Sequence, residues 1–279
     1  MSKQQIRHII EQHSQRDGLT GTGIKGVQLF QATSAIPCVP AVYEPCVIAI
    51  VSGAKEAVLD GKRYVYDDSR YMCCPMSMPV KAGTPSASPQ TPLYGVLIAL
   101  DARLMAELRA EGIKLAAWDD AFSDALLRLL QLGQSETDRA VLSDARLREL
   151  YYAILKGEAG VFARRAFGAG NAIARAISHV AAHLDAPISI DDMAQRAGMS
   201  RAVFHRKFKK VTTMSPIQFV KSMRLNNAAM KIAGGSTVSE AAMGVGYVSA
   251  SQFSREFKRM YGQSPREWSD AQQVAAGLA

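Results

Sequence analysis

The sequence lacks the apolar runs that a membrane protein needs. A membrane-spanning helix requires roughly 20 consecutive apolar residues, whereas the longest apolar stretch in these 279 residues lies around Val47 to Val51. The first ten residues, MSKQQIRHII, also lack the apolar core of a secretory signal. The sequence therefore predicts a cytoplasmic protein with no membrane partner.

Cysteine and histidine are scarce, which limits disulfide and metal chemistry. The chain has four cysteines, Cys38, Cys46, Cys73 and Cys74. Four are too few for a disulfide scaffold in a chain of this length. They also lack zinc-knuckle spacing, and none of the five histidines lies between residues 27 and 100, where the chain is rich in expected strands. We expect no bound metal, no cofactor and no catalytic residue.

Acidic residues are scarce in the last two fifths of the chain. Residues 170–279 hold 14 Lys and Arg against 7 Asp and Glu, a net charge of +7, whereas residues 1–169 hold 19 against 18, a net charge of +1. This asymmetry favours a polyanionic partner for one domain only. A solubilising surface charge is the alternative. At roughly 150 residues per domain, the length predicts two domains.

Short apolar runs separated by Pro and Gly fill the region from about Val27 to Leu100. Asp60-Gly61 lies between two such runs and predicts a type I′ hairpin, because both central residues must take a positive φ. The run TPSASPQTP, from Thr84 to Pro92, predicts a loop between two strands. Strands spaced by about ten residues predict a small barrel or sandwich. The GTGIKG pattern leads into a strand, so we do not expect a dinucleotide site.

From Asp101 the apolar spacing becomes helical, with Leu104, Leu108 and Ile113 beginning a series of three- and four-residue steps. The sequence predicts helices over about 101–157 that pack on the strands or present a stripe to a partner subunit. A stretch rich in Gly and Ala follows, which predicts a linker at 161–170. We therefore expect domains at 1–160, with strands over about 24–100, and at 171–279.

The last third of the chain contains an internal repeat. Residues 194–219 match residues 241–268 at an offset of 48, which becomes 49 after one inserted residue. The pairs at the offset of 49 are Phe204 and Phe253, Arg206 and Arg255, Phe208 and Phe257, Lys209 and Lys258, Ser215 and Ser264, and Pro216 and Pro265.

Each copy has the parts of a helix-turn-helix. A short helix, Ile190–Ala197 or Val238–Val245, meets a Gly at its end, and a Ser then opens a second helix. Two Phe four residues apart share the buried face of that helix, so its polar and basic residues point outward. Arg suits bidentate contacts to guanine and Lys suits phosphate contacts in a major groove. The predicted DNA-contacting residues are Ser200, Arg201, Ala202, His205, Arg206, Lys209, Ser249, Ala250, Ser251, Gln252, Ser254, Arg255 and Lys258.

A linker helix is predicted between the two copies. Pro216 suits its first turn, and Gly234-Gly235 end it. About 17 residues at about 1.5 Å each make a rod near 25 Å long, which suits two recognition helices about 34 Å apart. One chain could then read two successive major grooves. A helical hairpin repeat with solvated charges is the alternative.

The segment from about Asn171 to Ser269 resembles the AraC/XylS family of bacterial transcription regulators, most specifically in AAMGVGYVSASQFSREFKRMYGQSPREW. The resemblance implies seven helices in two helix-turn-helix units joined by a linker helix, in which Arg224 has a structural role. Thr213 departs from the family, which usually has Gly there. The base-reading positions that the resemblance implies are Ala202, His205, Arg206, Ala250, Ser251, Gln252 and Arg255.

The N-terminal part, from VQLFQATSAIPCVPAVYEPCVIAIVSG to LIALD, resembles the AraC-type regulatory domain, a cupin-like β-barrel followed by helices. The two resemblances imply an α+β two-domain regulator that binds double-stranded promoter DNA and whose first domain senses a small-molecule effector or dimerises. The cysteines leave an electrophile effector open as well. They also imply a possible homodimer, and RNA polymerase as a partner of an activator. Adjacent Cys73 and Cys74 on an alternating strand should point to opposite faces, and we expect one of them to face the barrel interior and contribute to an effector pocket. The expected effector-binding residues are therefore Tyr43, Tyr71, Cys73, Cys74 and Met76.

Two alternative functions remain open from the sequence. One is a DNA-binding repair or redox-type regulator whose N-terminal cysteines perform thiol chemistry, because AraC-like domains also occur fused to repair regulators that hold zinc on four Cys. The other is a constitutive nucleoid-type binder, which two polar recognition helices disfavour.

Overall fold

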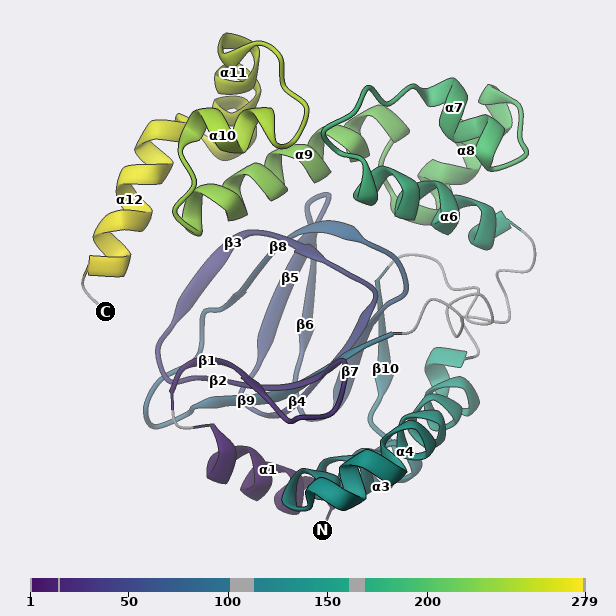
Figure 1. The fold of residues 1–279 in the computed structure, drawn as a ribbon, viewed down its shortest axis with the longest axis vertical. Helices are drawn as coiled ribbons and strands as arrows, with labels where there is room; N and C mark the ends of the chain where they lie inside the picture. The colour runs from purple at the N-terminus through teal and green to yellow at the C-terminus, as the bar shows by residue number, and fades with distance from the viewer. Residues whose placement is uncertain (1, 15, 101–112, 161–168, 278–279) are drawn as a thin grey trace. The chain divides into compact units, whose positions relative to one another are not determined.

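The computed structural model describes residues 2–14, 16–100, 113–160 and 169–277 (Figure 1). The chain divides into two compact units. One comprises Met1–Val39, Glu44–Met76 and Ala82–Asn171, and the other comprises Pro40–Tyr43, Ser77–Lys81 and Ala172–Ala279. We refer to residues 2–160 as the sheet region and to residues 169–277 as the helical region. The predicted α+β class, with a sheet-rich N-terminal part and an all-α C-terminal part, is confirmed.

The strands of the described residues form two sheets and not one closed barrel. One sheet has the order β1-β2-β9-β4-β7-β10 and the other the order β3-β8-β5-β6. The strands are β1 (Gly18–Gly21), β2 (Val27–Ala32), β3 (Ile36–Tyr43), β4 (Cys46–Ser52), β5 (Lys55–Leu59), β6 (Lys62–Tyr66), β7 (Arg70–Cys74), β8 (Met78–Thr84), β9 (Leu93–Ala99) and β10 (Lys114–Ala117). The loop predicted before residue 93 is present between β8 and β9.

The Asp60-Gly61 hairpin is confirmed. Strands β5 and β6 pair antiparallel with Leu59 opposite Lys62, which leaves two residues in the turn. Asp60 has a φ of 49° and Gly61 a φ of 75°, so both central residues take the positive φ that a type I′ turn requires.

The prediction of helices over about 101–157 is wrong at Lys114–Ala117. These residues form β10, which pairs antiparallel with β7. Four residues rich in Leu and Ala are too few to show a period, and pairing with a neighbouring strand overrides their helical propensity. Leu104 and Leu108 lie outside the described residues, as do residues 161–168 of the expected linker.

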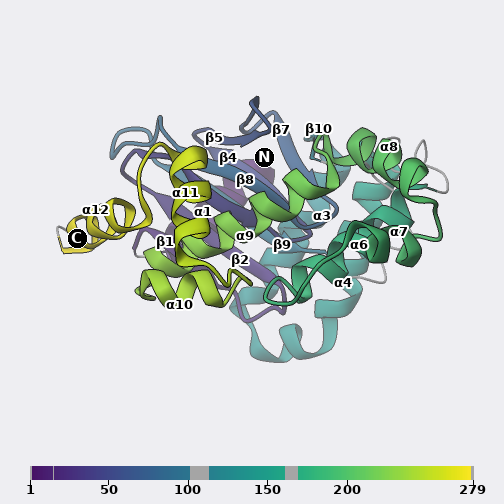
Figure 2. The same cartoon turned by 90° about the horizontal axis from the view of Figure 1, so that it is seen from above.

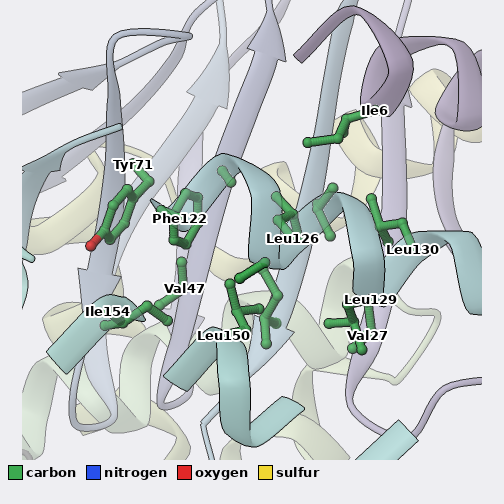
Figure 3. Close-up of a cluster of buried hydrophobic side chains, with 14 of the residues drawn as sticks. Ile6, Val27, Val47, Tyr71, Phe122, Leu126, Leu129, Leu130, Leu150 and Ile154 are labelled. Atoms are coloured by element: carbon green, nitrogen blue, oxygen red, sulfur yellow. The ribbon is translucent and has the colours of Figure 1, made fainter. Parts of the chain in front are cut away.

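Three helices cover one face of the six-stranded sheet: α1 (Ser2–His13), α3 (Asp120–Gln131) and α4 (Glu136–Lys156). A short turn, η1 (Leu132–Gln134), joins the last two. Figure 3 shows side chains of α3 and α4 meeting those of the strands, with Phe122 against Tyr71 and Leu150 and Ile154 near Val47. The buried cluster explains why Leu126, Leu129 and Leu130 recur at helical spacing in the sequence.

The helical region contains seven helices over residues 169–277. They are α6 (Ala169–Ala182), α7 (Ile190–Arg196), α8 (Arg201–Thr212), α9 (Pro216–Ala233), α10 (Val238–Met243), α11 (Ala250–Tyr261) and α12 (Pro265–Gly277). Figures 1 and 2 both show α9 running between the group α6–α8 and the group α10–α12. We call α7–α8 the first helix-turn-helix and α10–α11 the second. Among the described residues, none of the helices combines the length and the apolar character that crossing a bilayer requires.

The two halves of the repeat end their second helices in the same way, although only one has the residue suited to it. The backbone N–H of Thr213 donates to Lys209 O after α8, and that of Gly262 donates to Lys258 O after α11. Both residues are left-handed, with φ of 69° at Thr213 and 80° at Gly262. A β-branched residue is strained in this conformation, whereas Gly is not.

Replacing Thr213 by Gly should therefore stabilise the helical region by about 1 kcal/mol, because it relieves the strain of a left-handed side chain. Urea unfolding followed by circular dichroism at the helical minimum measures the change. The reciprocal variant Gly262→Thr, where a Cβ would meet no other atom within 4 Å, should destabilise the region. A loss of stability in Thr213→Gly would show that the threonine side chain makes a compensating contact.

Candidate DNA-binding surface

The outward face of α8 is polar and basic. Phe204 and Phe208 are fully buried, and Phe208 packs edge-on against Phe219 of α9 at 5.2 Å between ring centroids. This anchoring turns the opposite side of α8 to the surface. The exposed residues on that side are Ala202, His205, Arg206, Lys209 and Lys210, and Arg201 is exposed in the first turn.

Helix α11 repeats this arrangement. Phe253 and Phe257 are buried, and the ring of Phe257 lies 4.6 Å from that of Tyr261 and 6.2 Å from that of Trp268. The exposed residues are Ala250, Ser251, Gln252, Arg255, Lys258 and Arg259, whereas Ser254 is half-buried. Residues that match between the two copies in the sequence thus also take matching positions in the structure, with Arg206 and Arg255 at equivalent exposed positions.

The two N-terminal serines differ in their capping. Ser249 accepts a hydrogen bond from the backbone N–H of Gln252, whereas the Ser200 side chain makes no capping hydrogen bond. Ser200 is an exposed residue. Arg201 also differs from the other basic residues of α8, because its guanidinium pairs with Asp191 of α7 at 3.0 Å.

Helix α9 is the common support of both recognition helices. Ser215 and Gln218 form a capping box at its start, Pro216 occupies its first turn, and Gly234 ends it. Its 18 residues give a length of about 27 Å at about 1.5 Å per residue. The predicted linker helix is confirmed, and it contacts both α8 and α10.

One charged residue of α11 was absent from the predicted site. Glu256 is 8% exposed and lies on the buried face between Phe253 and Phe257. Its carboxylate accepts hydrogen bonds from Tyr247 at 2.8 Å and Lys221 at 3.1 Å. The sequence does contain a signal for this role, because Glu256 occupies a position on the apolar face of an amphipathic helix. A buried charge needs polar partners, so such a position predicts hydrogen bonds to the carboxylate.

Family comparisons agree with this geometry over both regions. Residues 23–162, just over half of the chain, match the family described as AraC-type transcriptional regulator N-terminus, and residues 193–271 match a helix-turn-helix domain. The chain belongs to the AraC-type transcriptional regulators.

Two relatives of this AraC-type regulator are described as regulators, and one solved structure shares its fold. Regulatory protein SoxS of Escherichia coli K12 is 31% identical over 93 residues, which are 33% of this chain and 87% of SoxS. The transcriptional regulator MtrA of Neisseria gonorrhoeae is 38% identical over 81 residues, covering 29% of this chain and 27% of MtrA. The crystal structure of unsaturated fatty acid-bound ToxT from Vibrio cholerae has the same fold, with a TM-score of 0.54 at 13% identity over 87% of this chain and 94% of ToxT.

The five residues expected to bind an effector do not share one face of the AraC-type regulator. Tyr71 and Cys73 belong to the core beneath the helices, where the ring of Tyr71 stacks on that of Phe122 at 4.2 Å. Cys74 follows them on β7 and points to the other face of the sheet, as strand alternation requires. Its thiol donates to the backbone carbonyl of Met76 at 3.1 Å. Tyr43 ends β3 and is half-buried.

The buried thiols of the AraC-type regulator are poorly suited to chemistry. Burial raises the pKa of Cys46 and of Cys73 to about 12, and it raises the pKa of Cys74 well above its usual value. The thiolate is the reactive form of cysteine, and the raised pKa values keep these side chains in the thiol form at neutral pH. Among the described residues, no three His, Cys, Asp or Glu side chains come together as a metal site would need.

Proposed function

We propose that this chain is a sequence-specific regulator that reads promoter DNA through α8 and α11 and acts by binding, without catalysis. One observation carries the proposal: two equivalent exposed basic faces rest on one linker helix. Arg201, Arg206, Lys209, Lys210, Arg255, Lys258 and Arg259 are all exposed on these two helices. Glu256 is the one acidic residue in either helix, and it is buried. We also propose a cytoplasmic location, which the proposed binding to promoter DNA supports.

Within this surface we propose a role for each group of exposed residues. Arg206 and Arg255 take equivalent outward positions and can each make a bidentate contact to guanine. Lys209 and Lys258 lie one turn nearer the helix C-terminus and suit phosphate contacts. The exposed Ala202 and Ala250 offer apolar contact or shape recognition, and His205, Ser251 and Gln252 offer hydrogen bonds to base edges. Ser200, Arg201, Ser249 and Ser254 complete the proposed contact set.

Replacing Arg206 or Arg255 by Ala should each cost about 1–3 kcal/mol at a cognate site and relax specificity at one base position. Fluorescence anisotropy with the selected site and all single-base variants measures both effects. Lys209→Ala is the matched control on α8, because it should weaken all sites equally. Equal losses on cognate and random DNA for Arg206→Ala would contradict base reading by that residue.

We further propose that the sheet region responds to a small-molecule effector. The structural likeness to ToxT, whose structure contains an unsaturated fatty acid, supports this proposal. The face of the sheet that carries Cys74, with Met76 just beyond the end of β7, is the better candidate, since Tyr71 and Cys73 pack against helix side chains. The raised pKa values of the buried thiols favour a non-covalent effector over an electrophile.

A homodimer through α4 is also proposed. Val141 is 71% exposed and Tyr152 65% exposed, and their separation of 11 residues places them on one side of the helix. Exposed apolar side chains aligned on one helix face suit contact with a second copy. RNA polymerase would be a further partner if the protein activates transcription.

A further inference from the structure

The two helix-turn-helix units meet at a tight contact beside α9. Gly246, in the turn between α10 and α11, has a φ of 82°. A Cβ placed on it would lie 2.7 Å from the carbonyl oxygen of Leu184 and 2.9 Å from that of Asp185. The turn of the second unit therefore lies directly on the backbone that leads from α6 into the first.

Arg224 of α9 lies at this contact. Its Nη2 donates to the carbonyl oxygen of Ala186 at 2.7 Å, and the same nitrogen would be 3.0 Å from a Cβ on Gly246. Arg224 thus touches the connector of the first unit and the turn of the second at once. Its side chain is half-buried, so the guanidinium is held between the two units.

The second recognition helix is tied to the same stretch of α9. Tyr247, next to Gly246, donates its hydroxyl to Glu256 of α11, and Lys221, one turn before Arg224, donates to the other carboxylate oxygen. Burial alone would raise the pKa of Glu256, but the hydrogen bonds from Tyr247 and Lys221 lower it below its usual value. The carboxylate is therefore ionised at neutral pH and holds both donors.

Side-chain packing between the units is incomplete next to these polar contacts. A cavity of about 310 Å³ is lined by Ile190 from the first unit, by Val248 and Gln252 from the second, and by residues of α9. An open space cannot fix the angle between the two helix-turn-helix units. The polar contacts of Arg224, Tyr247 and Lys221 therefore contribute more to that angle than side-chain packing does.

We propose that Arg224 is a positioning residue that fixes the distance and rotation between the two recognition helices, and so sets the spacing of the two halves of the DNA site. The inference rests on the proposed reading of DNA by both α8 and α11. Arg224 acts through the positions of these helices and makes no contact with a base.

The test measures how strongly binding depends on spacing. Full-length protein is titrated with the best site selected from random DNA, with versions carrying one or two inserted base pairs between the halves, and with a duplex carrying one half only. Each inserted pair moves the second half by about 3.4 Å and rotates it by about 35°.

For the original protein we expect one inserted pair to weaken binding by about 30-fold or more, and for Arg224→Ala by about threefold or less. The single half should bind both proteins equally. Lys231→Ala removes the same charge from an exposed position of α9 and should keep the original spacing profile. Arg224→Lys should restore part of the penalty. A loss of folding alone would lower the active fraction on every duplex and leave the ratio unchanged.

If Arg224→Ala does not fold, Tyr247→Phe takes its place, because it removes only the hydroxyl that donates to Glu256; we expect it to reduce the insertion penalty. An insertion penalty equal to that of the original protein in the folded variant overturns the inference. If the original protein binds one half as tightly as the full site, then reading by two helices fails, and with it the proposed function.

Discussion

Raising the monovalent salt concentration from 50 to 200 mM should weaken binding of this regulator to its DNA site by about 500-fold. Seven basic side chains are exposed on α8 and α11. If the five that are not assigned to guanine meet phosphates, the slope of log K against log salt is near −4.5, because each contact releases condensed counterions. Anisotropy titrations at four salt concentrations measure the slope.

The salt experiment also separates phosphate contacts from base contacts. Lys258→Ala should reduce the magnitude of the slope by about 0.9, since it removes one phosphate contact. Lys231→Ala is the control for net charge, because it lowers the charge by one at an exposed position of α9, outside both recognition helices. A slope near zero for the unchanged protein would contradict the proposed surface, whatever its affinity.

Replacing Phe257 by Ala should destabilise the helical region by about 3–5 kcal/mol and abolish DNA binding at 37 °C. Phe257 is fully buried, and its ring contacts those of Phe253, Tyr261 and Trp268. Truncation leaves a cavity among three aromatic rings that are held by their own helices and cannot close over it. Domains are stable by about 5–15 kcal/mol, so this loss leaves a domain at the lower end of that range near its unfolding threshold.

Each region of the chain contains one tryptophan, which makes the destabilisation measurable by region. Trp118 lies in the sheet region and Trp268 in the helical region, and both are buried. Denaturant unfolding in a Trp118→Phe background follows the helical region alone. Val248→Ala truncates a fully exposed side chain and should change the midpoint little. A Phe257→Ala midpoint equal to that of Val248→Ala would show that the aromatic cluster is not limiting for stability.

The helical region could be predicted well from the sequence, because its signals are local. Phe204 and Phe253 mark the buried faces, Pro216 marks the start of α9, and Gly246 marks a left-handed turn. Each of these signals depends on the residue's own backbone preference or on a spacing of three to four residues. The exposed faces of α8 and α11 follow directly from them.

The contacts that join distant residues could not be predicted in this way. The strand β10 forms because Lys114–Ala117 pair with β7, about 40 residues away. Whether Cys73 or Cys74 faces the helices depends on which side of the six-stranded sheet the helices cover, which no local pattern states. The contact of Gly246 with Leu184 depends on how two separate units pack. The residues expected to bind an effector lie on two faces of the sheet for the same reason, because their placement depends on contacts between distant parts of the chain.

The strained backbone at Thr213 affects how easily this regulator can evolve to recognise a different DNA site. New base-contacting residues on α8 or α11 usually lower stability, and a protein tolerates them only while it stays above its folding threshold. A single change of Thr213 to Gly adds stability at the C-terminal end of α8 without altering Arg206, His205 or any other outward residue. The strain at Thr213 therefore lowers the present stability by an amount that one substitution can restore. A descendant that first acquires Gly there can accept recognition-helix substitutions that would unfold the present protein.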